Sequence, residues 1–299
     1  MSLTAKQLEI RRSGITAGDV RALSGRDPYG RTAHNVWLDK FGLEDPSNDT
    51  EAKSLGEACE PIIVRSIVHH TTLSPVSRDP ESLTVRHRKH KHHIATPDVF
   101  LSLSPLEKAS SLGEAKLVGF WNRQDWGPSG SDEFPDWALI QCTWQGYVAN
   151  LPRVHLAAML GTEIRHYTIE IERELVGVLV ERADRFTVDH IKTRKPPPID
   201  GSKGSAATLA KIYPRAKGAI MKAGPQAEKY AARYLKAEAD LEAAELEREK
   251  AKQALIVLVG SCDGMKGDGW TVVHRNRAAY VVQSKSYTVR AGRRFRMVT

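Results

Sequence analysis

Three charged side chains near the middle of the chain have the types and spacing to do chemistry together. Asp98 ends the tripeptide TPD, fifteen residues follow, and Glu114 and Lys116 then flank Ala115. Side chains alternate along an extended strand, so Glu114 and Lys116 would share one face. Two carboxylates and the Ala115 backbone carbonyl form a hard oxygen site of the kind that Mg²⁺ or Mn²⁺ prefers. Such a metal can polarise a phosphodiester and activate a water, and Lys116 could hold that water or stabilise the developing charge.

The same pattern also arises by chance, because alternating charges on an exposed sheet face look identical. A carboxylate inside an otherwise apolar helical stretch, Glu60, favours a site, since a buried carboxylate needs a partner such as a metal-bound water. Glu60 could equally be a surface residue beside Pro61. Gln141 and Gln145 lie one helical turn apart and could orient a water or a phosphate. For Gln145 we expect only a polar position on a helix face.

Periodicity and capping signals place the elements that would position these residues. Thr16 can cap a helix that Gly25 ends, and Gly42 ends a second helix that begins near residue 33. A third helix over 54–70 has apolar positions at 55, 58, 62, 63, 67 and 68, which predicts one buried face. Two extended pieces over 83–103 and a strand from 111 form a hairpin. A helix over 137–149, strands over 153–161 and 164–172, and a helix over 174–191 complete an α/β core with a mixed sheet.

The remainder of the chain has a different composition. Residues 192–205 are rich in proline, glycine and serine, which is typical of a boundary, and 225–256 read as one long helix before several short strands. We predict a first domain over 1–195, a linker with a short helix over 196–224, and a C-terminal helix with a basic β extension over 225–299. The long helix could contact another copy, but we expect Tyr230 and Leu241 to pack on their own domain.

The net charge of +8 is concentrated in the C-terminal third. Residues 1–200 hold 25 basic and 27 acidic side chains, whereas residues 201–299 hold 19 and 9. A basic surface attracts phosphate polymers without reading their sequence. The tail after residue 268 is therefore a candidate DNA-contacting segment, although a generic solvated surface would have the same composition.

Several protein classes are disfavoured by the sequence. Cys59, Cys142 and Cys262 form no CxxC pair, which argues against a zinc ribbon or an iron–sulfur cluster and fits a reducing cytoplasm. The chain has no apolar run of membrane-spanning length, and MSLTAKQLEI lacks the apolar core of a signal peptide. We therefore expect a cytoplasmic protein with no membrane partner.

Two further groups of residues leave more than one interpretation open. His87, His90, His92 and His93 alternate with basic residues, a pattern compatible with a zinc site, a DNA-facing strand or a plain sheet edge. After the strand that carries Glu114, tryptophans at 121 and 126 could stack on bases of a frayed DNA end or pack in the core.

Five short motifs occur in a familiar order: ITAGDV, GxxxEP, TPD, GEAK and IQCTWQGYVA. Together they resemble the YqaJ-like viral recombinase family, which includes phage lambda-type exonuclease, within the PD-(D/E)xK nuclease superfamily. The resemblance covers roughly residues 10–190. It implies a restriction-endonuclease-like PD-(D/E)xK core, an α/β fold with a mixed central sheet flanked by helices, followed here by a long C-terminal helix and a small β extension.

The resemblance also implies roles for individual residues. Asp98, Glu114 and the Ala115 carbonyl match the family's metal ligands, and Lys116 matches its catalytic lysine. Glu60 matches a helix glutamate that assists the second metal or its water, and Gln141 matches the helix glutamine near the site.

The family's 5′-phosphate pocket uses an arginine just ahead of an ITAS segment. Arg11 stands at the matching distance from Thr16, and Gly18 replaces the family serine. Arg123 lies close to the position of a second family arginine, offset by one.

The activity implied is 5′→3′ degradation of one strand of linear duplex DNA with Mg²⁺ or Mn²⁺, leaving a 3′ single strand. The resemblance also implies a single-strand annealing protein as partner and a ring-shaped trimer. A structure-specific endonuclease of the same fold and a non-cutting DNA-binding recombination module are the alternatives.

Overall fold

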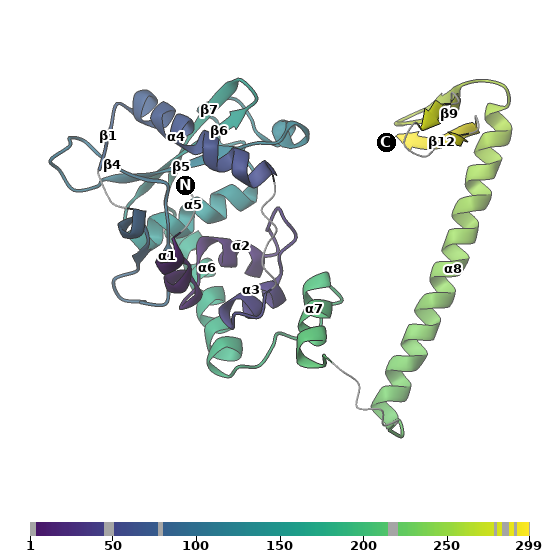
Figure 1. The fold of residues 1–299 in the computed structure, drawn as a ribbon, viewed down its shortest axis with the longest axis horizontal. Helices are drawn as coiled ribbons and strands as arrows, with labels where there is room; N and C mark the ends of the chain where they lie inside the picture. Colours follow the sequence, from purple (N-terminus) through teal and green to yellow (C-terminus); the bar gives the residue numbers. More distant parts are fainter. Residues whose placement is uncertain are drawn as a thin grey trace. The chain divides into compact units, whose positions relative to one another are not determined.

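A five-stranded mixed sheet lies at the centre of the first of two units in this computed structural model (Figure 1). The structure describes residues 4–44, 51–76, 80–214, 221–277, 280–282, 287–289 and 292–298. The units cover residues 1–216 and 217–299. The sheet order is β1-β4-β5-β6-β7, from β1 (Ser74–Pro75), β4 (Val99–Ser102), β5 (Ser111–Leu117), β6 (Arg153–Leu160) and β7 (Glu163–Glu170).

The strand directions follow from how the strands are connected. β4 and β5 form the predicted antiparallel hairpin, with Val99 opposite Gly113, and β6 and β7 form a second hairpin. β5 and β6 are parallel, with Glu114 opposite Leu156. Parallel neighbours need a crossover, and helix α5 (Asp136–Ala149) supplies it. The expected mixed sheet flanked by helices is therefore confirmed.

Helices cover both faces of the sheet (Figure 1). Helix α4 (Glu51–Thr71) packs on one face, where Ile63 and Ile67 meet Leu101 and other strand residues. Helix α5 packs on the other face. The expectation that Leu55 and Ile62 share the buried face of α4 is wrong, since they are 54% and 53% exposed. Successive helical residues lie about 100° apart, so Ile62 points away from the stripe that carries Ile63.

A second helical layer packs on the outer side of α5. It contains α2 (Ala17–Leu23), α3 (Ala33–Lys40) and α6 (Arg173–Phe186), which continues as a wider π-helical turn, η3 (Thr187–Lys192). Thr16 caps α2, and Gly25 and Gly42 adopt positive φ after α2 and α3, as the sequence predicts. The remaining elements before residue 193 are α1 (Ala5–Arg12), η1 (Pro80–Leu83), β2 (Val85–Arg86), β3 (Ile94–Ala95) and η2 (Phe120–Asp125).

Part of the predicted linker packs on this unit. Helix α7 (Lys203–Ile212) lies against α3, where His34 Nδ1 is 3.2 Å from the Thr208 hydroxyl. His34 Nε2 is 3.0 Å from the Pro198 carbonyl. Residues 196–212 of the predicted linker therefore pack as part of the first unit.

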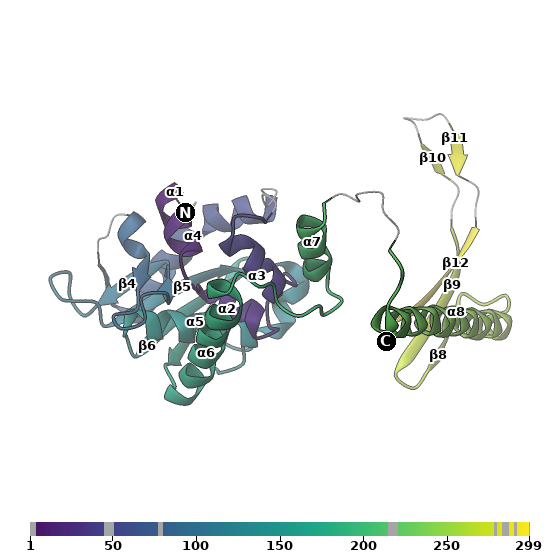
Figure 2. The same cartoon turned by 90° about the horizontal axis from the view of Figure 1, so that it is seen from below.

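The second unit contains the long helix and the strands of the tail (Figure 2). Helix α8 spans Pro225–Val259, and β12 (Gly292–Val298), β9 (Trp270–Arg277) and β8 (Gly264–Gly267) form an antiparallel sheet. The strands β10 (Tyr280–Val282) and β11 (Tyr287–Val289) form a separate hairpin. Tyr230 and Leu241 are exposed on α8, so their expected packing within this unit is not observed. The side chains of the basic tail from residue 275 onward lie outside the described residues. Across the described segments, every helix is too short or too polar to cross a membrane.

Gly113, the residue before Glu114, packs closely against the neighbouring strand β4 and against α4. A Cβ there would lie 2.5 Å from Val99 Cγ1 and 3.3 Å from Ile67 Cδ1. We expect Gly113→Ala to lower the free energy of unfolding by about 1–3 kcal/mol, the usual cost of overpacking a core. Urea unfolding measures this change.

Gly56 provides the matched control, because a Cβ there meets nothing within 4 Å. Alanine is the better helix former, so Gly56→Ala should leave stability unchanged or raise it by up to about 1 kcal/mol. Equal effects of the two substitutions would contradict the proposed close packing at Gly113.

Candidate active site

The carboxylate of Glu114 is the centre of the candidate site. It lies on β5, its residue is only 2% exposed, and its oxygens accept three side-chain hydrogen bonds. Lys116 Nζ and Gln141 Nε2 donate to Oε1, and Gln145 Nε2 donates to Oε2 at 2.8 Å. The two glutamines come from α5, so the crossover helix lies over the face of β5 that carries Glu114.

Asp98 lies beside this carboxylate, just before β4. Its Oδ2 accepts a hydrogen bond from the backbone N–H of Ala115 at 2.7 Å. In an extended strand the N–H and C=O of one residue point to the same side. The Ala115 carbonyl therefore also points toward Asp98, and the structure brings together the three oxygen groups that the sequence selects.

The charges of the site are strongly coupled. Burial raises the pKa of Asp98 well above its ordinary value, Glu114 raises it further, and Glu60 adds to this against the opposing charge of Lys116. Glu60 is half-buried on α4. Its charge is close enough to raise the pKa of Asp98, so Glu60 contributes to the electrostatic environment of the candidate site. For Lys116, burial lowers the pKa, but Glu114 and Asp98 outweigh that effect and the net pKa is raised. Lys116 is therefore a cation at physiological pH.

These residues fit a divalent cation of the magnesium class. The donor set consists of two buried carboxylates and a carbonyl, which are hard oxygen ligands. Burial first and the Glu114 carboxylate second raise the pKa of Asp98, so a cation bound between the two carboxylates would stabilise the charged form of Asp98. Within the described part of the chain, Gln145 Oε1 is also buried without a hydrogen-bond partner, which leaves an acceptor available for a metal-bound water.

Two residues at the site were missed or underrated from the sequence. Gln145, expected to be a polar helix-face residue, is 2% exposed and bonded to Glu114. Arg21 on α2 donates from Nη1 to Gln141 Oε1 at 2.6 Å, lies 3.5 Å from Asp27, and sits over the Trp137 ring. Helical spacing predicts that Gln145 lies on the same side of α5 as Gln141. Whether that side faces the sheet or the solvent depends on tertiary packing.

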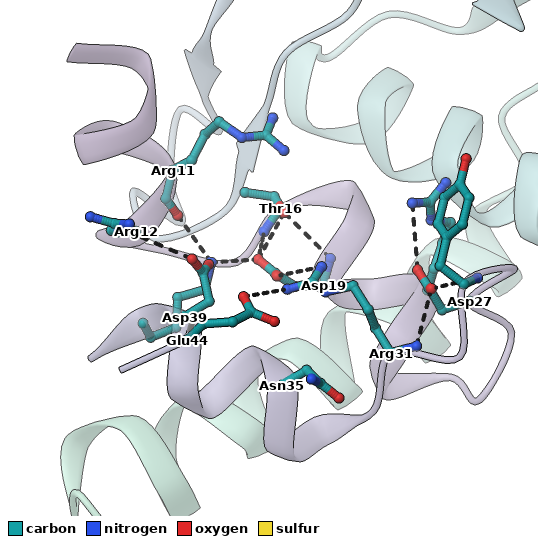
Figure 3. A network of polar contacts seen from close by, with 12 residues as sticks. Arg11, Arg12, Thr16, Asp19, Asp27, Arg31, Asn35, Asp39 and Glu44 are labelled. Atoms are coloured by element: carbon teal, nitrogen blue, oxygen red, sulfur yellow. Dashed lines mark hydrogen bonds and ion pairs between the residues drawn. The ribbon is translucent and has the colours of Figure 1, made fainter. Parts of the chain in front are cut away.

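Arg11, Thr16 and Gly18, three of the residues predicted for the 5′-phosphate pocket, lie at the end of α1 and the start of α2; Figure 3 shows Arg11 and Thr16. Arg11 donates from Nη1 to Thr96 Oγ1 at 3.2 Å, which ties it to the TPD segment. Burial is the main cause that lowers the pKa of Arg11. A Cβ on Gly18 would lie 3.7 Å from both Arg21 Nη2 and Arg31 Nη1. The structure therefore places Gly18 between two guanidinium groups.

A buried ion pair holds this region in place (Figure 3). Lys40 Nζ lies 2.6 Å from Asp19 Oδ2, and both side chains are 2% exposed. Asp19 also accepts hydrogen bonds from the backbone N–H and hydroxyl of Thr16 and lies 3.9 Å from Arg31. Burial raises the pKa of Asp19, but Lys40 and Arg31 lower it more, so the net pKa is below its ordinary value. The N-cap of α2 is thereby fixed to α3.

Arg123 and the two tryptophans occupy different environments. Arg123 is exposed on η2, with its guanidinium 5.9 Å from the Phe120 ring centroid. Trp126 is buried and packs against Trp137 and Tyr167, so core packing is its role. Trp121 is 83% exposed and remains available for stacking.

The histidine run lies in the connection between β2 and β3. His93 is fully buried, with its ring nitrogens 3.0 Å from the Tyr147 hydroxyl and 3.0 Å from Asp184 Oδ1. Burial, reinforced by His92, lowers the pKa of His93 to about 4. His92 Nε2 also lies 2.6 Å from Asp184 Oδ1. The second half of the run packs against α6, which does not match the expectation of a plain sheet edge.

Comparison with known proteins identifies the first half of the chain. Residues 6–152 match the model of the YqaJ-like viral recombinase domain, so this segment is a domain of that family, as the five motifs indicate. No curated protein matches the chain.

Among solved structures, an alkaline exonuclease from Laribacter hongkongensis is 13% identical, with a TM-score of 0.49, and the match covers 64% of this chain and 94% of that one. A phage related exonuclease from Haemophilus somnus 129PT is 8% identical, with a TM-score of 0.40, and the match covers 65% and 96%.

The Asp19–Lys40 pair gives a test of how α2 is positioned. Lys40→Met leaves Asp19 buried without its nearest cation, so we expect the free energy of unfolding at pH 7 to fall by roughly 3–5 kcal/mol. Because the pKa of Asp19 is lowered in the folded protein, its contribution is present above its ordinary pKa of 3.8 and is lost as the pH falls through the lower folded value. The deficit of Lys40→Met in urea unfolding should therefore shrink below pH 3.8.

The control removes an exposed pair. Arg185 bonds Glu181 one helical turn away on α6, and both side chains are about two-thirds exposed. Arg185→Met should lower the free energy of unfolding by less than about 1 kcal/mol. If Lys40→Met costs no more than this control, the buried pair does not hold α2 in place.

Proposed function

We propose that this protein is a divalent-metal-dependent DNA exonuclease that digests linear duplex DNA from its ends. The observation that carries the proposal is the convergence of Asp98, Glu114 and Lys116 on one buried point of a YqaJ-like viral recombinase domain. A DNA-binding module without hydrolytic activity has no need to bury two carboxylates and a lysine together, because burying like charges raises their free energy.

In this proposal each residue of the candidate site has a separate role. Asp98, Glu114 and the Ala115 carbonyl hold Mg²⁺ or Mn²⁺, with Glu60 near a second ion or its water. When bound, such an ion polarises the phosphodiester and lowers the pKa of a bound water. Lys116, a cation, stabilises the negative charge that develops at phosphorus. Gln141 and Gln145 hold the Glu114 carboxylate in place, and Arg21 holds Gln141.

We propose further that cleavage runs 5′→3′ and leaves a 3′ single strand. Arg11, Thr16 and Gly18 adjoin the TPD segment and the guanidinium groups of Arg21 and Arg31, which supports a 5′-phosphate pocket beside the carboxylates. Arg123 joins the DNA contacts from η2. A single-strand annealing protein as partner and a ring of three copies rest on the family match alone.

Substitutions at the carboxylate centre should remove most of the cleavage activity in protein that remains folded. We expect Asp98→Asn, Glu114→Gln and Lys116→Met each to slow digestion of linear duplex DNA by roughly 10²–10³-fold or more, as when a group that stabilises the transition state is removed. End-labelled duplexes with Mg²⁺ give the rate and the strand polarity.

Asp132→Asn and Lys108→Met are matched controls, because both side chains are exposed in loops. A covalently closed circular duplex separates the alternatives, since an exonuclease needs an end. Cleavage of the circle would indicate an endonuclease, and equal rates for the wild type and all three variants would contradict the proposed site.

The 5′-phosphate pocket makes a prediction about the DNA end. Arg11→Met should reduce the preference for a 5′-phosphorylated end over a 5′-hydroxyl end by roughly 10–100-fold, the usual value of a charge-assisted hydrogen bond. Gly18→Ser should fold normally, since its Cβ meets only ordinary contacts at 3.7–3.8 Å, and its hydroxyl should strengthen the preference. Initial rates on the two kinds of end measure both effects.

Arg12→Met is the matched control, because Arg12 is adjacent, has a 57% exposed side chain and pairs with Asp39 at the surface. If Arg12→Met changes the preference as much as Arg11→Met, general electrostatics rather than a pocket explains it.

A further inference from the structure

A second cluster of metal-ligating side chains lies in the first unit and shares no residue with the carboxylate centre. His90 and His93 come from the connection between β2 and β3, and Asp184 comes from α6. One ligand atom of each lies within 4.8 Å of the other two. His93 is fully buried, and His90 and Asp184 are half-buried, so the cluster is part of the folded structure rather than a chance grouping on the surface.

His92 adjoins this group through Asp184, and its ring centroid lies 6.2 Å from that of His90. Its Nε2 lies 2.6 Å from Asp184 Oδ1, and its ring centroid lies 4.2 Å from that of His93. His93 Nε2 lies 3.0 Å from the same carboxylate oxygen. Donors on a tetrahedral zinc ion with bonds of about 2.0–2.1 Å are roughly 3.3 Å apart. A metal would therefore draw the ligand atoms of His90, His93 and Asp184 in from their present spacing of up to 4.8 Å, and rotation of His92 toward them would complete a four-coordinate site.

A second interaction orients the buried ligand. Tyr147 on α5 places its hydroxyl 3.0 Å from His93 Nδ1. When Nδ1–H donates to this oxygen, the lone pair of Nε2 points toward Asp184 and is available to a metal. A ligand histidine whose other nitrogen is hydrogen-bonded in this way is the usual arrangement in protein metal sites.

The donor types distinguish this cluster from the carboxylate centre. Three imidazoles and one carboxylate suit zinc and neighbouring divalent transition metals, whereas carboxylates and carbonyls suit magnesium. The two sites of this chain should therefore take different ions.

The position of the cluster indicates what a bound metal would hold together. Ile15 N–H donates to the His92 carbonyl at 2.6 Å, and Ile94 N–H donates to the Ile15 carbonyl at 2.9 Å. A Cβ on Gly14 would lie 2.2 Å from the His92 carbonyl oxygen, so the two segments are in direct contact. Ile15 immediately precedes Thr16, the N-cap of α2. A link from the histidine connection to α6 would fix this segment between them.

We propose that His90, His92, His93 and Asp184 form a structural site for zinc that fastens the connection between β2 and β3, and with it the start of α2, to α6. His93 and Asp184 are 91 residues apart in the chain. A cross-link that closes so long a loop stabilises the folded state by restricting the unfolded chain. The site does not depend on the proposed nuclease activity.

The test uses the full chain carrying Asp98→Asn, so that the carboxylate centre contributes little to metal binding. Metal is removed with a chelator, and Co²⁺ is then added while its visible absorption is recorded. We expect one equivalent to bind with the intense bands of four-coordinate cobalt, one equivalent of Zn²⁺ to displace it, and Zn²⁺ to raise the Tm.

Variants in this background assign the ligands. His90→Gln and Asp184→Asn should each weaken Zn²⁺ binding by about 100-fold or more, and Tyr147→Phe by about tenfold, as expected for loss of a hydrogen bond to a ligand. His69→Gln, an exposed histidine on α4, is the matched control and should bind as the parent does. The Tm of each variant in the presence of chelator shows whether that variant folds. If only one of His90→Gln and Asp184→Asn folds, that variant alone is sufficient for the test.

Absence of a tight equivalent of Co²⁺ or Zn²⁺ in the Asp98→Asn protein would overturn the proposal. Unchanged affinity in folded His90→Gln or Asp184→Asn would do so as well, as would five- or six-coordinate cobalt spectra. None of these results would bear on cleavage of DNA, which is measured separately.

Discussion

The buried carboxylate of Glu114 is the constraint on which the rest of the first unit depends. A charge that is only 2% exposed in the middle of a sheet is stable only when donors surround it. Lys116, Gln141 and Gln145 provide these donors from β5 and α5. Both glutamines must therefore face the strand, which requires α5 to cross directly over β5. The parallel β5–α5–β6 unit is thus a structural requirement of the site as well as of the fold.

The position of α5 depends in turn on the outer helices. Arg21 donates to Gln141 from the opposite side, and α2 carries Arg21. The buried pair of Asp19 and Lys40 fixes α2 to α3. Through α2, which carries both Asp19 and Arg21, polar contacts thus connect α3 to Glu114, while apolar residues such as Trp144 fill the space between the helices. A substitution in α2 or α3 can therefore alter the orientation of Gln141, which holds the Glu114 carboxylate.

Features set by local sequence could be predicted, whereas features set by the rotation of one element against another could not. The cap at Thr16 and the shared face of Glu114 and Lys116 follow from two- to four-residue patterns. The inward direction of Gln145 depends on how α5 sits on the sheet, which periodicity leaves undetermined. Ile62 is exposed for the same reason: how α4 is rotated on the sheet decides which of its apolar residues are buried. Asp184 meets the histidine run across 91 residues, and no local pattern encodes such a contact.

The electrostatic environment of Arg11 distinguishes it from the other cations near the candidate site. Arg21 lies beside Asp27, Arg31 lies between Asp19 and Glu44, and Lys40 bonds Asp19, so each has a carboxylate within 4 Å. Among the residues that the structure describes, Arg11 has no carboxylate this close; its guanidinium donates to a neutral hydroxyl, that of Thr96, and burial lowers its pKa. A partly desolvated cation without an ion-pair partner of this kind gains the most from an arriving anion. Because Thr96 is two residues from Asp98 and accepts a hydrogen bond from Arg11, an anion bound by Arg11 would lie beside the carboxylate centre, as the proposed 5′-phosphate pocket requires.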